Sequence, residues 1–344
     1  MAKTKASRVT LTDVARRTGV SLSTVSKVLN GRSDVADTTR ELIEQAFSDL
    51  AYVSRTERRI STHGRTVLVV LANGVNAYAA QVIEGIMAQA TEFGVEIVLT
   101  RATAADQISP GSLVQDITNG GHVGVILVNP DFKDEDAAYL TRRHVPMAMV
   151  DPIDPIHDEG MSIGSTNWSG GFTITKYLID QGHQHIAFVG GPKRSLVNQA
   201  RISGYRAALD QAHLAIDESL ITYGFFRYNT GYQQGMRLLQ LQHRPSAIVS
   251  ASDASALGVM AAARELGMLL PTDLSVTGYD DTWAAEWAVP PLTTIHQPME
   301  EMGAEALRVV IEESEGNSPS SRRIELNTKL VVRKSVAAPF TGQE

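Results

Sequence analysis

The sequence of 344 residues contains no cysteine. This absence excludes disulfide bonds and metal sites built from thiolates, and it is typical of a protein that stays in a reducing cytoplasm. No segment approaches the ~20 consecutive apolar residues that span a bilayer, and no apolar run follows the basic start as it does in a signal peptide. The sequence therefore predicts a cytoplasmic protein with no membrane partner.

The motifs of several enzyme classes are also missing. After Leu71 the chain continues "ANGVNAYAAQ", which lacks the glycine fingerprint of dinucleotide-binding enzymes, and no P-loop, nucleophile elbow or zinc motif occurs. "VGGPKRS" is interpreted as a strand-to-helix turn rather than a phosphate loop. His183 and His185 have metal-ligand spacing for a strand, but no acidic or thiol partner repeats nearby, so they are interpreted as the join between a helix and a strand. We expect no catalysis, no cofactor and no metal.

Positive charge is scarce overall but concentrated near the N-terminus. The net charge is −7, yet residues 1–65 hold 12 Lys and Arg against 7 Asp and Glu, a balance of +5 that leaves −12 for the remainder. An uneven surface could arise by chance, but this asymmetry favours a nucleic-acid-binding segment at the N-terminus.

The pattern of residues 11–50 predicts three short helices. Thr10 or Thr12 caps a first helix that Gly19 ends, and Ser21 caps a second helix whose inward face is Val25, Val28 and Leu29. A third, from about 37 to 50, offers four apolar side chains to cover the first two: Leu42, Ile43, Ala46 and Leu50. This is a helix-turn-helix, and its second helix presents an outward face of mostly short polar side chains that can approach DNA closely: Leu22, Ser23, Thr24, Ser26 and Lys27.

From Val67 onward, short apolar runs alternate with amphipathic helical patterns. The runs "VLVVLA", "VEIVL", "VGVILV", "PMAMV", "IAFV" and "SAIVS" are typical of buried parallel strands. Enough strand-helix units are present for two doubly wound parallel sheets.

These residues closely resemble the lactose-repressor family of bacterial transcription regulators. The resemblance lies first in "VTLTDVARRTGVSLSTVSKVLNG" and "VADTTRELIEQAFSDLAY". It implies a DNA-binding domain over residues 1–53, where the alternative is a helical bundle used only for packing. Base-reading positions fall on Leu22, Ser23 and Lys27. Phosphate-contacting positions fall on Thr10, Thr24, Ser26, Asn30 and Thr39.

The hinge expected over residues 54–66 departs from the family pattern. The usual hinge leucine enters the minor groove, but "VSRTERRISTHGRT" has Ser61 at that position. Ile60 can serve as the wedge if the register shifts by one, and the alternative is a solvated basic linker. We predict that Ile60 is the apolar wedge and that the hinge residues Arg58 and Arg59 strengthen attraction to phosphates. Arg55 is a further hinge residue, in place of the family's asparagine.

The resemblance extends through the core, residues 67–344. Segments such as "ARISGYRAAL" and "PPLTTIHQPMEEMGAEAL" follow the family's sugar-sensing domain, which is similar to periplasmic binding proteins. It implies an N-terminal all-α domain followed by an α/β core of two doubly wound parallel-sheet lobes. Lobe one is expected at 67–164 plus 294–323, and lobe two at 165–293 plus 324–338.

Candidate effector ligands follow the carboxyl ends of predicted strands, where open α/β sheets bind ligands. A sugar needs paired polar groups and an aromatic platform, which these positions supply. The strand-end residues are Asn129, Asp151, Ser252, Asp253 and Asp280. The family match adds Asn73, Tyr78, Arg201, Phe226 and Gln297. Two departures, Ser252 in place of an asparagine and the small Ala72, allow a larger or differently oriented effector, and for each carboxylate the alternative is a turn or cap residue.

The family reading predicts a repressor of sugar-use genes that its sugar releases from a near-palindromic operator. Two-fold operators require a homodimer, and the absence of leucine heptads near the end of the sequence argues against a tetramer-forming coiled coil. A sugar- or nucleotide-binding enzyme with an appended DNA module is the competing class. A transport-type sugar-binding protein conflicts with the helix-turn-helix and with the missing signal peptide.

Overall fold

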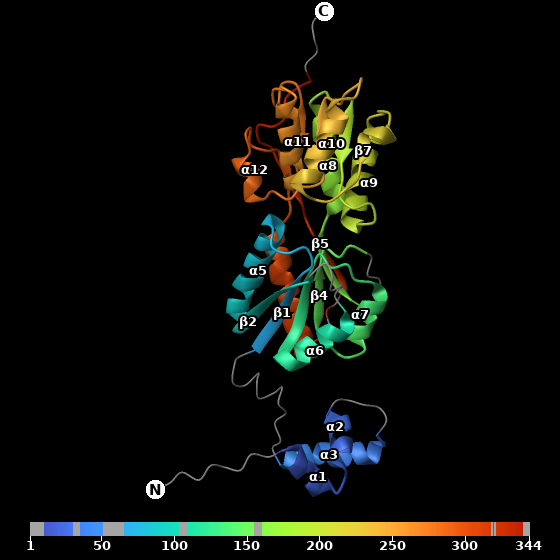
Figure 1. Ribbon diagram of the computed structural model, residues 1–344, viewed down its shortest axis with the longest axis vertical. Helices are drawn as coiled ribbons and strands as arrows, with labels where there is room; N and C mark the ends of the chain where they lie inside the picture. The colour runs from blue at the N-terminus through green and yellow to red at the C-terminus, as the bar shows by residue number, and fades with distance from the viewer. Residues whose placement is uncertain are drawn as a thin grey trace, which may run out of the picture. The chain divides into compact units, whose positions relative to one another are not determined.

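A computed structural model describes residues 10–29, 35–50, 65–102, 109–154, 160–317, 319 and 321–339. The chain divides into two compact units, a small helical unit ending at Gly64 and a larger unit that begins at Arg65 (Figure 1).

The small unit is the predicted helix-turn-helix. Helix α1 is Leu11–Thr18, α2 is Leu22–Leu29 and α3 is Asp37–Asp49. Thr10 and Asp13 form a reciprocal capping box at the start of α1, and Gly19 ends it with φ 73°. The Thr24 amide donates to Ser21 Oγ at 3.1 Å, as expected of a cap on α2. The expected first two helices are therefore confirmed with their caps.

Val14, Val25 and Ile43 are fully buried where the three helices meet. Leu42 was expected in this core, but its side chain is 50% exposed. The prediction was wrong because Leu42 and Ile43 are adjacent on a helix, so they point about 100° apart and only one can face inward. Val35, which precedes α3, is buried in the core although the sequence pattern did not indicate it.

Lobe one of the large unit is a six-stranded, all-parallel sheet in the order β11-β5-β4-β3-β1-β2. Its strands are β1 Arg65–Leu71, β2 Val95–Arg101, β3 His122–Val128, β4 Met147–Val150, β5 Met161–Ser165 and β11 Arg323–Leu326. Its helices are α5 Ala77–Phe93, α6 Pro110–Gly120, α7 Asp134–Thr141 and α13 Met299–Ser314.

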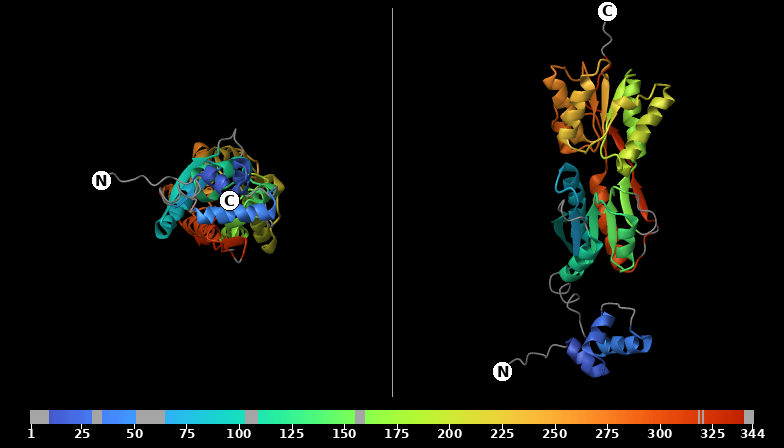
Figure 2. Two further views of the ribbon diagram at one scale, coloured as in Figure 1. Left: turned by 90° about the horizontal axis from the view of Figure 1, so that it is seen from below. Right: turned by 45° about the vertical axis from the view of Figure 1, so that its right-hand side comes forward.

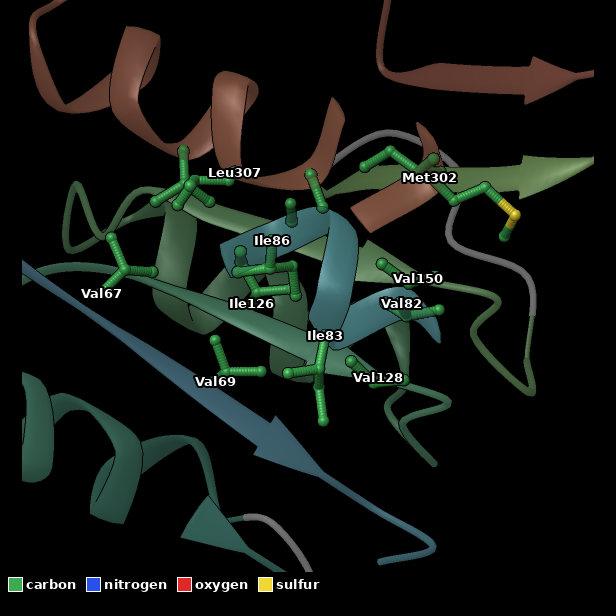
Figure 3. Close-up of a cluster of buried hydrophobic side chains, with 14 of the residues drawn as sticks. Val67, Val69, Val82, Ile83, Ile86, Ile126, Val128, Val150, Met302 and Leu307 are labelled. Carbon is green, nitrogen blue, oxygen red and sulfur yellow. The ribbon is translucent and has the colours of Figure 1, made fainter. Parts of the chain in front are cut away.

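Alternate strand residues point to opposite faces of this sheet and fill two cores. Val67 and Val69 of β1 face α5 and α13, where they pack with Ile86 and Leu307 (Figure 3). The intervening residues, such as Leu68, face α6 and α7.

Strand β2 is exposed along most of its length, although its sequence "VEIVL" was expected to be buried. Val98 is 39% exposed and Leu99 48% exposed. These side chains are exposed because β2 is the edge strand of the sheet and pairs only with β1. A short apolar run does not distinguish a central strand from an edge strand.

Lobe two has a four-stranded parallel sheet in the order β7-β6-β8-β9. Its strands are β6 Ile186–Val189, β7 Ile221–Thr222, β8 Ala247–Ser250 and β9 Ser275–Thr277, with a 3-10 turn η1 Glu218–Leu220 before β7. Helices α8 Asn167–Asp180 and α9 Leu196–Gln211 cover one face, while α10 Tyr228–Leu239, α11 Asp253–Glu265 and α12 Trp283–Trp287 cover the other (Figure 2).

Three crossing segments join the lobes and hydrogen-bond to one another. The Ser165 hydroxyl donates to Gln297 Oε1 at 2.6 Å, and the Thr328 amide donates to Thr166 Oγ1 at 2.9 Å. A two-stranded antiparallel ribbon, β10 Thr294–His296 with β12 Lys329–Val331, lies beside this junction.

The strand pairing differs from the expected division of the lobes. Residues 324–326 were expected in lobe two, but β11 pairs in parallel with β5 of lobe one. Residues 294–296 were expected in lobe one, but β10 pairs with β12 and bridges Asp280 of lobe two. The chain is extended both before and after it crosses between the lobes. The hydrophobic pattern therefore does not show where a crossing occurs.

Candidate functional site

The outward face of α2 carries the predicted DNA-reading residues. Leu22 is 49% exposed, and Ser23 and Lys27 are exposed beside it. This placement follows from burial, because Val25 and Val28 hold the opposite face in the core. The helix-turn-helix therefore leaves these three side chains on the surface that the fold uses to approach a major groove.

A group of hydroxyls surrounds the N-terminal end of α2. Ser21 Oγ lies 2.8 Å from Ser23 Oγ and 2.8 Å from Thr24 Oγ1. Short side chains and amide groups at a helix N-terminus favour contact with phosphate oxygens. Of the predicted phosphate-contacting residues, Thr10 is exposed, while Thr24, Ser26 and Thr39 are half-buried. Asn30 and the hinge residues Arg55, Arg58, Arg59 and Ile60 lie outside the described residues.

Arg201 lies at the centre of a second, buried polar cluster in the large unit. It is 3% exposed, its Nε donates to Asn167 Oδ1 at 2.8 Å, and its guanidinium lies 3.6 Å from the centroid of the Tyr279 ring. An Nη lies 3.7 Å from Asp280 Oδ1, and the Phe226 ring centroid is 5.6 Å away. The guanidinium thus lies against the Tyr279 ring, near the Phe226 ring and beside a carboxylate.

Asp280 follows β9 and links Arg201 to the crossing segments. Its φ is 112°, a rare backbone conformation for a non-glycine residue that is typical of ligand sites. Its Oδ1 accepts a hydrogen bond from Gln297 Nε2 at 2.7 Å, and Gln297 in turn accepts from Ser165. Burial raises the pKa of Asp280 to about 7, against the lowering effect of Arg201.

Asp151 follows β4 and brings lobe one into the cluster. The Tyr78 hydroxyl donates to Asp151 Oδ2 at 2.7 Å, and Asn129 Nδ2 donates to the Asp151 carbonyl oxygen at 3.4 Å. Burial raises the pKa of the Asp151 carboxyl. Burial and the neighbouring Asp151 carboxylate also raise the pKa of the Tyr78 hydroxyl well above its usual range. Asp280 and Arg201 also act on the Tyr78 hydroxyl through charge, so the two carboxylates and the guanidinium share one electrostatic environment.

Of the other predicted effector residues, Ser252 and Asn73 lie outside this cluster, whereas Asp253 borders it at Asp280. Ser252 Oγ caps α11 by accepting from the Ser255 amide. Asp253 is fully buried and accepts hydrogen bonds from Thr282 and Thr294. These partners are 29 and 41 residues away in the chain, so the turn-and-cap alternative does not describe the contacts. Burial and the charge of Asp280 raise the pKa of Asp253 well above its usual range. Asn73 is exposed in the turn after β1.

The histidine pair has the structural role that the sequence indicated. His183 lies between α8 and β6, is buried, and has ring nitrogens close to Ser246, Ser275 and the Ala337 carbonyl oxygen. Within the described ranges, no group of three His, Asp or Glu side chains could hold a metal ion. None of the helices in those ranges is long and apolar enough to cross a membrane.

Sequence reasoning missed Asn167, Ser165 and Tyr279 as members of the cluster. Asn167 is the first residue of α8, and such an asparagine reads as an ordinary helix cap. Tyr279 sits next to the predicted Asp280 and is fully buried, so it reads as core. Of these three, only Asn167 could have been found from the sequence, because it begins a helix just after the end of a strand, where ligands bind in such sheets.

A cavity of about 310 Å³ adjoins the polar cluster at Asp151 and Asn167. Its walls come from both lobes, including β5 and β11 of lobe one and α9 of lobe two. Paired carboxylate, guanidinium and amide groups at the end of such a cavity can bind a small molecule that both donates and accepts hydrogen bonds.

Comparison with known proteins gives relatives for both units of the chain. Residues 10–54 match the family described as bacterial regulatory proteins, lacI family, and residues 175–336 match a periplasmic binding protein-like domain. The HTH-type transcriptional repressor PurR of Klebsiella pneumoniae is 30% identical over 335 residues, covering 96% of this chain and 98% of PurR. PurR of Vibrio campbellii is 32% identical over 332 residues, covering 95% and 98%.

Solved structures give the same result. A complex of the transcriptional regulator CelR with cellobiose is 31% identical, with a TM-score of 0.72 over 95% of this chain and 100% of that one. The lac repressor dimer bound to operator and the anti-inducer ONPF is 28% identical, with a TM-score of 0.70 over 96% and 100%. These relatives are repressors and regulators rather than enzymes. The chain therefore belongs to the lacI family of bacterial regulatory proteins and is a DNA-binding transcriptional repressor.

Proposed function

We propose that this repressor controls sugar-use genes and that a sugar bound at the Arg201 cluster changes its affinity for the operator. The observation that carries the proposal is the convergence of Asp151, Arg201 and Asp280, with Gln297, beside a cavity. Vicinal sugar hydroxyls donate to carboxylates and accept from guanidinium and amide groups. The Phe226 ring, close to Arg201, offers an apolar face for sugar C–H groups.

A purine is the second candidate effector, because the curated relatives include repressors named PurR. Thermal-shift measurements on the full chain with a panel of sugars and free purine bases separate the two. A ligand at ~100 times its dissociation constant adds about 2.7 kcal/mol to the free energy of unfolding. Stabilisation by a sugar and not by a base supports the proposal, and the reverse result replaces the sugar with a purine.

The DNA-binding form is proposed to be a homodimer on a near-palindromic operator, with Ile60 of each hinge as the minor-groove wedge. Two copies place two recognition helices on the two half-sites of such a sequence. Exposed apolar side chains in the large unit support an interface with a second copy; Trp287 is 69% exposed and Val289 73% exposed. A ligand then acts by binding unequally to two arrangements of the lobes, which alters how the paired hinges meet DNA.

Lys27 and Ser26 are expected to contribute differently to DNA binding. If exposed Lys27 reads a base edge, Lys27→Ala costs about 1–3 kcal/mol on the operator and relaxes preference at one base pair. Ser26→Ala weakens binding to operator and random DNA alike, because phosphate contacts carry no sequence information. Fluorescence anisotropy on both DNAs measures this difference. Equal losses on the two DNAs for Lys27→Ala would remove it from the base-reading set.

Effector affinity is expected to rise with pH through the pKa of Asp280. A sugar hydroxyl donates to the ionised carboxylate, so binding favours the charged form, lowers the pKa of Asp280 from about 7 and releases a proton. Calorimetric titrations at about pH 6 and pH 8, in buffers of different ionisation enthalpy, measure both the affinity and the proton release. An affinity that falls as pH rises would mean that Asp280 binds the ligand as a neutral donor.

A further inference from the structure

The cavity beside the Arg201 cluster has walls unlike those of an apolar packing defect. Its polar wall residues include Asp151, Ser162, Ser165 and Asn167, and its apolar ones include Leu196 and Trp168. Strand β11 adds Arg323 and Glu325, joined by a hydrogen bond from Arg323 Nε to Glu325 Oε1 at 3.1 Å. Carboxylate, guanidinium and an aromatic ring thus occur here a second time.

Two neighbouring strands, β5 and β11, form one wall of the cavity. Ser162 and Gly164 of β5 lie in register with Arg323 and Glu325 of β11. The opposite face of both strands, with Ile163 and Leu326, packs in the core under α5 and α13. Within the described residues, the apolar cluster under α6 and α7 includes no residue of β5 or β11. The polar face of these strands therefore borders the cavity.

Trp168 forms a wall of this space and is held in place by stacking. Its ring is stacked on Phe172, one turn further along α8, with centroids 5.3 Å apart and planes 12° apart. The side chain nevertheless remains 47% exposed. A rigid, half-exposed indole beside hydroxyl and charged groups is suited to stacking against the C–H face of a sugar ring.

Gly164 lines the cavity next to Asp151 of the cluster. A Cβ atom at this position would lie 3.1 Å from Asp151 Oδ1, closer than nearly all such contacts. Any larger side chain would cover the Asp151 carboxylate on the side that faces the cavity. Because residue 164 is glycine, a ligand held by Asp151 can extend over the backbone into the cavity.

We infer that the cavity is a subsite for the second ring of a disaccharide effector, and that Gly164 determines this specificity. The inner ring binds Asp151, Arg201 and Asp280, and the outer ring stacks on Trp168 and bonds to the Arg323–Glu325 pair. This inference rests on the proposed sugar site and adds the size of its ligand. It also defines a test that separates the subsite from the site itself.

The test is calorimetric titration of the full chain with a panel of disaccharides (cellobiose, maltose, lactose and sucrose) and with glucose and galactose. We expect one disaccharide to bind at least about tenfold more tightly than its component monosaccharide, the factor that corresponds to 1.4 kcal/mol. Trp168→Ala should remove this advantage while leaving monosaccharide affinity unchanged, because Trp168 contacts only the outer ring. Gly164→Val should lower the affinity for both classes of sugar, because its side chain also covers Asp151. The control Tyr228→Ala, which truncates another aromatic residue that is 47% exposed, should change neither affinity.

Two results overturn the inference in distinguishable ways. Equal affinity for disaccharide and monosaccharide, or full disaccharide affinity in Trp168→Ala, removes the subsite and leaves the proposed sugar site standing. Binding of neither class removes the sugar site and the subsite together. Operator affinity and the midpoint of thermal unfolding, measured on each variant, show whether a loss reflects misfolding, and in that case Trp168→Ala decides the question.

Discussion

Arg201→Ala is expected to abolish the effector response while operator affinity stays close to that of the wild type. Arg201 is buried and lies beside Asp280. Its guanidinium donates hydrogen bonds to Asn167 and to the Ala251 carbonyl oxygen. Hydrogen bonds to charged groups are worth about 1.5–3 kcal/mol each, and losing two of them to a ligand lowers affinity by roughly a hundredfold or more. Calorimetric titration with the effector and anisotropy with operator DNA measure the two properties separately.

Arg201→Lys is the matched control for charge. It keeps a cation near Asp280 but loses the planar fork that bonds Asn167 and stacks on Tyr279, so affinity should fall between those of the wild type and Arg201→Ala. Asp280→Ala should lose the response in the same way. An unchanged ligand titration in Arg201→Ala and Asp280→Ala would show that the effector binds elsewhere.

Gly204→Ala is expected to destabilise the large unit and weaken effector binding together. Helices α8 and α9 approach each other closely at two glycines. A Cβ at Gly204 would lie 2.2 Å from the Trp168 carbonyl oxygen, and one at Gly171 would lie 2.2 Å from the Arg201 carbonyl oxygen. The helices must move apart, which costs about 1–3 kcal/mol or more and displaces Asn167 from Arg201. Thermal unfolding and effector titration measure the two effects.

Gly111→Ala is the control for the substitution itself. Gly111 lies in α6, and a Cβ there would make only ordinary contacts at 3.7 Å. Alanine is the better helix former by about 1 kcal/mol, so this variant should unfold at the same temperature or higher. A Gly204→Ala protein that unfolds with the wild type and binds effector normally would show that the close helix contact does not position the cluster.

The sequence was most informative for features that depend only on residues close together in the chain, such as helix ends and the buried face of a helix. Caps at Thr10 and Ser21, the left-handed Gly19 and the buried Val25 each follow from short-range chemistry, and the structure confirms them. Strand-end position also predicted Asp151 and Asp280 as candidates, because each follows a strand of its own parallel sheet, β4 of lobe one and β9 of lobe two.

Sequence reasoning was weaker where the outcome depends on neighbours distant in the chain. Asp253 also follows a strand, but Thr282 and Thr294 from other segments take up its carboxylate. The edge position of β2 and the pairing of β11 with β5 depend on strand order, which a run of apolar residues does not encode. The role of Gly164 depends on its contact with Asp151, which only the folded chain brings about.

The central claim is that one chain couples a buried effector cluster to DNA binding. Its most direct test is a fluorescence-anisotropy titration of the full chain against a near-palindromic sequence selected from random DNA, with and without the saturating sugar found by thermal shift. The account predicts tight binding to the palindrome alone and a loss of at least about tenfold, or 1.4 kcal/mol, when the sugar is added. Identical operator affinity with and without a sugar that demonstrably binds the chain would contradict it.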